Sequence, residues 1–300
     1  MGHHHQHAEV NGFRLYLTIG LNVIITVTEI IGGMISGSLA LLSDAIHNLS
    51  DTISLVLSGV AIHYAKKDAS NSNTFGYKRA EILAALFNSG SMLVICVLLV
   101  KEAIVRFFHP EPIQGEIMLI VATIGLVANL FSMLLLKNDS KKSLNIKSAY
   151  LHMLADTLSS VAVVGGGIVL IFYNLPWLDS LLTLVIALYI LKESVGAFKM
   201  AFKIVMESTP PKLDVIAIKN RVESIENVKN LHHLHVWNLT EKEIILEGHI
   251  TTEKDVMISE SERLLATIKE ELHHSFGIDH VTLQFESTVC DSDTLIDNNH

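Results

Sequence analysis

Long apolar stretches fill most of residues 13–205 and constrain the fold more than any other feature of the sequence. A helix that crosses a bilayer needs about 20 mostly apolar residues. Six stretches have this character: 13–35, 39–63, 81–107, 117–136, 148–172 and 177–199. Backbone groups inside lipid must be hydrogen-bonded within the protein, so we predict a membrane-embedded, all-α bundle of six helices. The low content of charged residues, 18%, agrees with this class.

The basic residues between the stretches predict the orientation, because Lys and Arg are retained on the cytoplasmic side. Segments 64–80 and 137–147 each hold four of them, whereas 36–38, 108–116 and 173–176 hold none. Six spans then place both termini in the cytoplasm. The short loops favour the cell (inner) membrane of a bacterium. The net charge of −9 argues against nucleic acid as a partner.

A second domain is predicted after the last stretch, where Pro210 and Pro211 end the helix. Segment 209–287 reads as a small α/β domain. Its expected elements are a helix at 212–224, strands at 230–239 and 243–252, a helix at 256–275 and a strand at 279–286. A domain of this size is marginally stable alone, and dimerisation would help it. The polar segment 288–300 is predicted to be a flexible tail.

The second and fifth stretches share one polar phrase, His-x-Leu-x-Asp-Thr-(Ile/Leu)-Ser, which begins at His47 and again at His152. Residues four apart lie on the same face of a helix. Each helix therefore presents an imidazole and a carboxylate one turn apart. Ionisable groups within a membrane are costly and are normally paired or functional. If the two helices face each other, His47, Asp51, His152 and Asp156 surround one point.

Two imidazoles and two carboxylates form a ligand set that suits Zn²⁺. Zinc sites are usually four-coordinate with N, O and S ligands, and two carboxylates balance the charge of the ion. The set contains no thiolate, which disfavours copper(I). The alternative is that each pair only hydrogen-bonds across a helix interface. The repetition of the pair in two separate stretches favours the metal site.

Other polar residues leave alternatives open. Asp44, one turn before His47, either relays ions or holds a neighbouring helix. Asn48 is a candidate for orienting a ligand. Glu29 is expected to reflect helix packing or a wet cavity. The histidine-rich N-terminus, 1–12, is either native, where it would gather metal, or an expression tag, and its interrupted run favours the native interpretation.

Several motifs carry a resemblance to a known family. Segments 38–51 and 73–81, the pair His152 and Asp156, and the phrase His232-x-x-His235-Val-Trp237 resemble the cation diffusion facilitator family, and in particular its zinc, cadmium and cobalt exporters. The resemblance implies a homodimer, with a six-helix transmembrane domain at 13–208 and a cytoplasmic, metallochaperone-like (ferredoxin-like) α/β domain at 209–287. It also implies exchange of metal for protons, and it assigns the transport site to the two His-Asp pairs.

The resemblance further implies a metal site in the C-terminal domain. His232 and His249 match ligand positions on adjacent strands, and Gln284 and Glu286 stand where some relatives have stronger ligands. Neighbouring residues in a strand face opposite ways, so His232 and His233 are not expected to serve one site. Both metal binding and dimerisation alone stay open for this domain.

Two features of the 64–80 loop also follow from the resemblance. Asn73 and Tyr77 stand where some relatives have ligands, so a loop metal site is not expected. Arg79 and Glu207 resemble a pair that, in relatives, locks the membrane and cytoplasmic parts together.

These observations predict a proton-coupled antiporter that exports Zn²⁺, with Cd²⁺ or Co²⁺ as alternatives, and not an enzyme. An intramembrane metalloenzyme is disfavoured, because the sequence has no His-Glu-x-x-His motif and four ligands leave no place for an activated water. A membrane-tethered metal sensor would leave the repeated pair without a role. The expected partners are divalent metal ions, protons, the lipid membrane and a second copy of the chain.

Overall fold

The computed structural model describes residues 12–137, 144–173, 175–287 and 294–296. The chain divides into two compact units. One consists of Met1–Gly59 with Phe87–Ala197, and the other of Val60–Leu86 with Phe198–His300.

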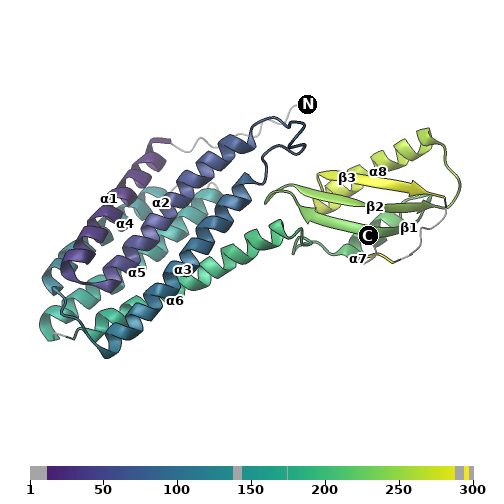
Figure 1. Ribbon diagram of the computed structural model, residues 1–300. Helices are drawn as coiled ribbons and strands as arrows, with labels where there is room; N and C mark the ends of the chain where they lie inside the picture. Colours follow the sequence, from purple (N-terminus) through teal and green to yellow (C-terminus); the bar gives the residue numbers. More distant parts are fainter. Residues whose placement is uncertain (1–11, 138–143, 174, 288–293, 297–300) are drawn as a thin grey trace. The chain divides into compact units, whose positions relative to one another are not determined.

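Six long helices occupy the first two-thirds of the chain, coloured purple to green in Figure 1. They are α1 (Gly12–Ser36), α2 (Leu39–Ala65), α3 (Ala80–Phe108), α4 (Gly115–Lys137), α5 (Leu144–Tyr173) and α6 (Trp177–Val205). Each coincides with a predicted stretch to within a few residues. Among the described residues, α2 to α6 are long and apolar enough to cross a membrane, and the apolar part of α1, Gly20–Ser36, is shorter. The helical membrane class is confirmed, and the count of six spans stays a prediction.

The outer surface of these helices is apolar and uncovered. In the most apolar part of each of the five helices, only 25–39% of the residues are buried inside the protein. Large side chains such as Phe87, Phe131 and Phe172 are exposed. Extended apolar surface of this kind marks contact with a membrane or a partner. The chain is therefore a multi-pass membrane protein.

One hydrophobic core joins five of the helices. Leu41, Cys96, Met118, Val163 and Ile190 come from α2, α3, α4, α5 and α6 in turn, and all five are essentially inaccessible. The first helix packs against α4, and α4 against α5. This packing brings α1, α2, α4 and α5 around the polar residues described below.

Contacts from α3 and α6 hold the turn between α1 and α2. Gly37 has a φ of 75°, which a residue without Cβ adopts at little cost. Asp179 of α6 caps the start of α2, because its carboxylate accepts hydrogen bonds from the Ser38 hydroxyl (2.5 Å) and the Leu39 N–H (2.7 Å). Arg106 of α3 donates to the Gly37 carbonyl (2.9 Å). These contacts fix the beginning of the helix that carries the first His-Asp pair.

The C-terminal domain follows the predicted order of elements (Figure 1). They are α7 (Val215–Glu223), β1 (Val228–Asn238), β2 (Ile244–Thr252), α8 (Ile258–Phe276) and β3 (His280–Glu286). The sheet has the order β1-β2-β3, with β1 antiparallel and β3 parallel to β2. The parallel pair needs a long crossover, which α8 supplies. A small mixed sheet with helices is thus confirmed, and the ferredoxin-like fold stays a prediction.

The core of this domain lies between one face of the sheet and the two helices. Leu231 and Leu246 from the strands pack with Ile218 of α7 and Ile268 of α8, and all four are inaccessible. Asp214 caps α7 by accepting from the Ile216 N–H. The other face of the sheet remains for polar groups.

Candidate metal centres

In the first unit, α2 and α5 bring the two repeated His-Asp pairs together. Asp51 Oδ2 lies 3.6 Å from His47 Nε2 in its own helix and 2.9 Å from His152 Nε2 on α5. Asp156 reaches the same two nitrogens, with Oδ1 3.5 Å from His47 and Oδ2 3.6 Å from His152. Each carboxylate therefore contacts both imidazoles, one in its own helix and one in the other helix.

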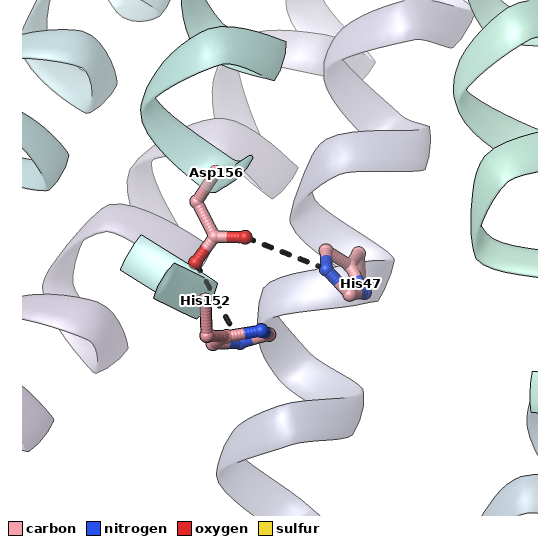
Figure 2. Close-up of side chains that lie close together, drawn as sticks. All are labelled: His47, His152 and Asp156. Carbon is pink, nitrogen blue, oxygen red and sulfur yellow. Dashed lines mark ion pairs between the residues drawn. The ribbon is translucent and has the colours of Figure 1, made fainter. Parts of the chain in front are cut away.

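Figure 2 shows His47 from α2 turned toward His152 and Asp156 from α5. The potential ligand atoms of these three residues all lie within 4.8 Å of one another, and Asp51 stands outside this group of three. In a tetrahedral zinc site with bonds of about 2.0–2.2 Å, ligand atoms are roughly 3.3 Å apart. The four His-Asp distances bracket that value. The group of His47, His152 and Asp156 could hold a metal ion, and a zinc shell that includes Asp51 stays a prediction.

The cluster is buried on one side and accessible on the other. Asp156 and His47 are buried, with relative exposures of 3% and 9%. The side chains of Asp51 and His152 keep 28% and 38% of their surface. Asp156 Oδ2 is inaccessible and has no hydrogen-bond partner among the described residues. A buried carboxylate oxygen normally has a partner, so this oxygen is available as an acceptor.

Two neighbouring polar residues connect the site to the surrounding helices. Asp44 accepts a hydrogen bond from the Ser159 hydroxyl of α5 (3.0 Å), which supports its role in holding a neighbouring helix. The Asn48 amide donates to Glu29 Oε2 on α1 (2.9 Å). Asn48 thus contacts α1. Its role in orienting a metal ligand stays a prediction. The contact of Glu29 with α2 agrees with the expectation that this acid reflects helix packing.

A second cluster lies in the C-terminal domain. Glu286 bridges two histidines, with Oε2 3.2 Å from His232 Nε2 and Oε1 3.0 Å from His249 Nδ1. The ligand atoms of the three residues lie within 4.8 Å of one another. Gln284 donates from its amide to Glu286 Oε1 (2.9 Å), so it positions the carboxylate. His232 is fully buried and its Nδ1 has no hydrogen-bond partner among the described residues.

The sheet register explains how these residues meet. His232 stands opposite His249, and the next pair, Leu231 and Ile250, belongs to the core. Side chains alternate across a strand, so the two histidines lie on the face away from α7 and α8. Glu286 on β3 stands opposite Thr251, two residues from His249 on β2.

The alternation assumed for β1 does not hold at His233. A register shift falls between His232 and His235, and His233 has a φ of 49°. Its ring stacks on that of His249, with centroids 4.8 Å apart. His233 stands outside the three-residue cluster but beside one of its members. The backbone N–H of His233 donates to the Thr294 carbonyl, a contact that no local sequence signal reveals.

Ion pairs link the α2–α3 loop to two other parts of the second unit. Arg79 Nη2 lies 2.8 Å from Glu207 Oε1, so the two residues that the resemblance paired form an ion pair. Lys78 Nζ contacts both oxygens of Glu243, at 2.7 and 2.9 Å. The histidines of segment 1–12 and most of the tail 288–300 lie outside the described residues.

The fold and the first cluster define a class: multi-pass membrane proteins that hold clustered His and Asp side chains, of the kind that can bind a metal, within a helical bundle and carry a small α/β domain. The family model described as the cation efflux transmembrane domain matches residues 15–206. The model described as the cation efflux protein, cytoplasmic domain matches residues 210–288. The chain belongs to the cation efflux family, and the resemblance to cation diffusion facilitators is confirmed.

Curated relatives are similar over nearly the whole chain. A "Cadmium, cobalt and zinc/H(+)-K(+) antiporter" of Bacillus subtilis (strain 168) is 39% identical over 298 residues, covering 99% of this chain and 95% of the relative. The "Metal cation efflux system protein CzcD" of Cupriavidus metallidurans is 35% identical, covering 97% and 91%. The "Zinc transporter ZitB" of Escherichia coli (strain K12) is 34% identical, covering 97% and 94%. All three are named as transporters or efflux proteins.

Proposed function

We propose that this protein is a proton-coupled antiporter that exports Zn²⁺ from the cytoplasm, with Cd²⁺ or Co²⁺ as alternative substrates. The transported ion binds His47, Asp51, His152 and Asp156. The observation that carries the proposal is that each carboxylate contacts both imidazoles, at 2.9–3.6 Å, within the apolar helices. The names of the relatives support metal efflux as the activity.

The mechanism follows from competition for the same atoms. Zinc binds neutral imidazoles and ionised carboxylates. In its absence the Asp51–His152 contact at 2.9 Å is a hydrogen bond that needs a proton. Metal entry from the cytoplasm displaces protons, and protons from the outer side displace the metal. His suits this exchange because its pKa in water lies near neutrality. No covalent step is required, and we expect no enzymatic activity.

The proposal also covers the arrangement around the site. It includes six spans within 13–208, a ferredoxin-like cytoplasmic domain at 209–287, both termini in the cytoplasm, an inner-membrane location and a homodimer. Zinc bound by His232, His249 and Glu286 would regulate transport by favouring one arrangement of the dimer. The N-terminal histidines within 1–12 would gather metal.

The decisive experiment measures Zn²⁺ flux into proteoliposomes with an imposed pH gradient. The variants are Asp51→Ala and Asp156→Ala, with Asp68→Ala as a control because Asp68 is an exposed acid of the α2–α3 loop. We expect transport by wild type and the control and none by the two site variants. Wild-type flux from Asp51→Ala would contradict the four-residue site. A wild type that moves no Zn²⁺, Cd²⁺ or Co²⁺ would contradict the function.

A further inference from the structure

A buried seam of polar groups runs between α1 and α2 beside the transport site. Glu29 of α1 is 1% exposed and holds the Asn48 amide at 2.9 Å. Asp44 and Asn48 are four residues apart and therefore share one face of α2. Asn22 of α1 donates to the Asn48 carbonyl (3.4 Å) and to the Thr52 hydroxyl (3.3 Å). The seam thus continues over several turns of both helices.

Two carboxylates of this seam lack a positive partner. Among the described residues, no Lys, Arg or His nitrogen lies within 4.0 Å of Glu29 or Asp44, whereas Asp51 and Asp156 each contact both site histidines. Asp44 is 3% exposed. A buried carboxylate without a countercharge is costly. A divalent ion in the transport site balances only Asp51 and Asp156, so the charge of Glu29 and Asp44 must be reduced in another way, by a proton or by a further cation.

Unpartnered oxygens point to where that cation lies. Asn48 is 1% exposed, and its Oδ1 has no hydrogen-bond partner among the described residues. The nitrogen of the same amide group donates to Glu29. Ser43, next to Asp44, is fully buried and its hydroxyl is likewise unpartnered within the described part of the chain. Buried acceptors of this kind normally have a partner.

We propose that Glu29, Asp44 and the Asn48 amide oxygen form a second cation site, which takes one monovalent cation, a proton or K⁺, as the counter-ion of transport. The inference rests on the proposed function and adds a second place for an exchanged ion, beside the transport site whose own residues exchange protons with zinc. Oxygen ligands alone suit a hard cation.

Zinc and the counter-ion are expected to weaken each other's binding. The charged or titratable groups that act electrostatically on Glu29 are Asp44 and His47 from α2 and Asp156 from α5, while α4 presents the uncharged Gly125. His47 and Asp156 are themselves transport-site ligands. Like charges in a medium of low dielectric constant repel each other strongly. Entry of zinc therefore drives the monovalent cation out.

The test uses Glu29→Gln in the full-length protein in detergent. Glutamine keeps the size of the side chain and an oxygen for the Asn48 amide but loses the charge. Calorimetric zinc titrations in two buffers of different ionisation enthalpy give the number of protons released per zinc. A parallel series of zinc titrations compares a buffer that contains choline as its monovalent cation with one that contains excess K⁺. If the Asn48–Glu29 hydrogen bond only holds α1 against α2, the glutamine oxygen still accepts that bond and neither measurement changes.

If the counter-ion is a proton, proton release per zinc falls by about one in Glu29→Gln. The variant has one titratable group fewer from which metal binding can displace a proton. If it is K⁺, excess K⁺ weakens zinc binding to wild type about fivefold or more, the low end of typical coupling between sites, and leaves Glu29→Gln unaffected. The inference is overturned if the variant binds zinc with wild-type proton release and wild-type K⁺ dependence. A wild type that binds no zinc overturns the proposed function instead, and this inference with it.

Two glycines provide a matched steric test that keeps the charge of Glu29. A Cβ on Gly125 of α4 would lie 2.5 Å from Glu29 Oε1, whereas one on Gly165 of α5 would meet nothing within 4 Å. Gly125→Ala is expected to reproduce the changes seen in Glu29→Gln, and Gly165→Ala to behave as wild type. Glu29→Asp, which keeps the charge, should retain part of the coupling. Equal, wild-type values for both alanine variants would contradict the site even if Glu29→Gln failed to fold.

Discussion

Asp156 is the ligand candidate whose removal should separate metal binding from folding. It is buried, and its Oδ2 has no hydrogen-bond partner among the described residues. Asp156→Asn keeps the shape and removes a buried charge. We expect zinc affinity to fall by at least about tenfold, the low end of what loss of a supporting partner costs, with no loss of thermal stability in metal-free buffer. Calorimetry and thermal unfolding measure the two effects, with Asp68→Asn as control. Unchanged affinity would exclude Asp156 as a ligand.

Single residues were predictable from the sequence where the signal is local. The i,i+4 spacing placed His47 with Asp51 and His152 with Asp156, because a helix has only one geometry. Partners on other elements were not predictable in this way. The Asn48–Glu29 contact depends on how α1 meets α2.

At the scale of elements, the cap on α2 should control the stability of the bundle. The Asp179 carboxylate accepts hydrogen bonds from the Ser38 hydroxyl and from the Leu39 and Ala40 N–H groups. Asp179→Ala leaves these buried donors without an acceptor, which costs about 1–3 kcal/mol for each unsatisfied group. We expect the thermal unfolding midpoint to fall by at least about 2–4 °C. Asp68→Ala serves as control, and equal midpoints for the two variants would show that the cap contributes nothing.

The C-terminal strands should bind metal independently of the bundle site. His249 contacts Glu286 at 3.0 Å and is partly accessible, so His249→Ala removes one member of the cluster without opening the core. We expect one zinc ion fewer per chain by equilibrium dialysis. Zinc flux continues, because the transport site is intact, but it loses its regulation by this cluster. His280→Ala, on an exposed position of β3, is the control. Unchanged zinc content would leave dimerisation as the role of this domain.

Elements differ in how far sequence reveals them. The helices were found to within a few residues, because apolar stretches of that length have one solution in a membrane. The strands of the C-terminal domain were also found. The bulge in β1 was not, since it is tied to backbone contacts of His233 and Leu234 with Thr294 and Leu295, about 60 residues further along.

At the scale of the whole molecule, the order of the two parts followed from composition, whereas the ion pairs of the second unit depended on the fold. Arg79 and Glu207 were paired by resemblance. The contact of Lys78 with Glu243 was not anticipated, because the two residues lie 165 positions apart. Charges on exposed loops carry no periodicity from which a partner can be deduced.

The Arg79–Glu207 pair yields a prediction about transport and not about stability. Both side chains are well exposed, and an exposed ion pair contributes only about 0–1 kcal/mol to folding. If the pair acts as a hinge, Arg79→Glu should reduce zinc flux by placing two acids together. The double variant Arg79→Glu/Glu207→Arg should recover part of it, because the attraction is restored with its direction reversed.

A matched control is available in the same unit. Arg221 and Glu271 form another exposed pair, with Nε 2.7 Å from Oε1, between α7 and α8. Arg221→Glu and its double reversal with Glu271→Arg should leave flux unchanged, because this pair lies within one layer of the C-terminal domain. Flux measured in proteoliposomes at low and high salt completes the test, since salt screens exposed charges. If Arg79→Glu transports zinc like wild type, or if its loss is not relieved by the reversed partner, the Arg79–Glu207 contact has no role as a hinge.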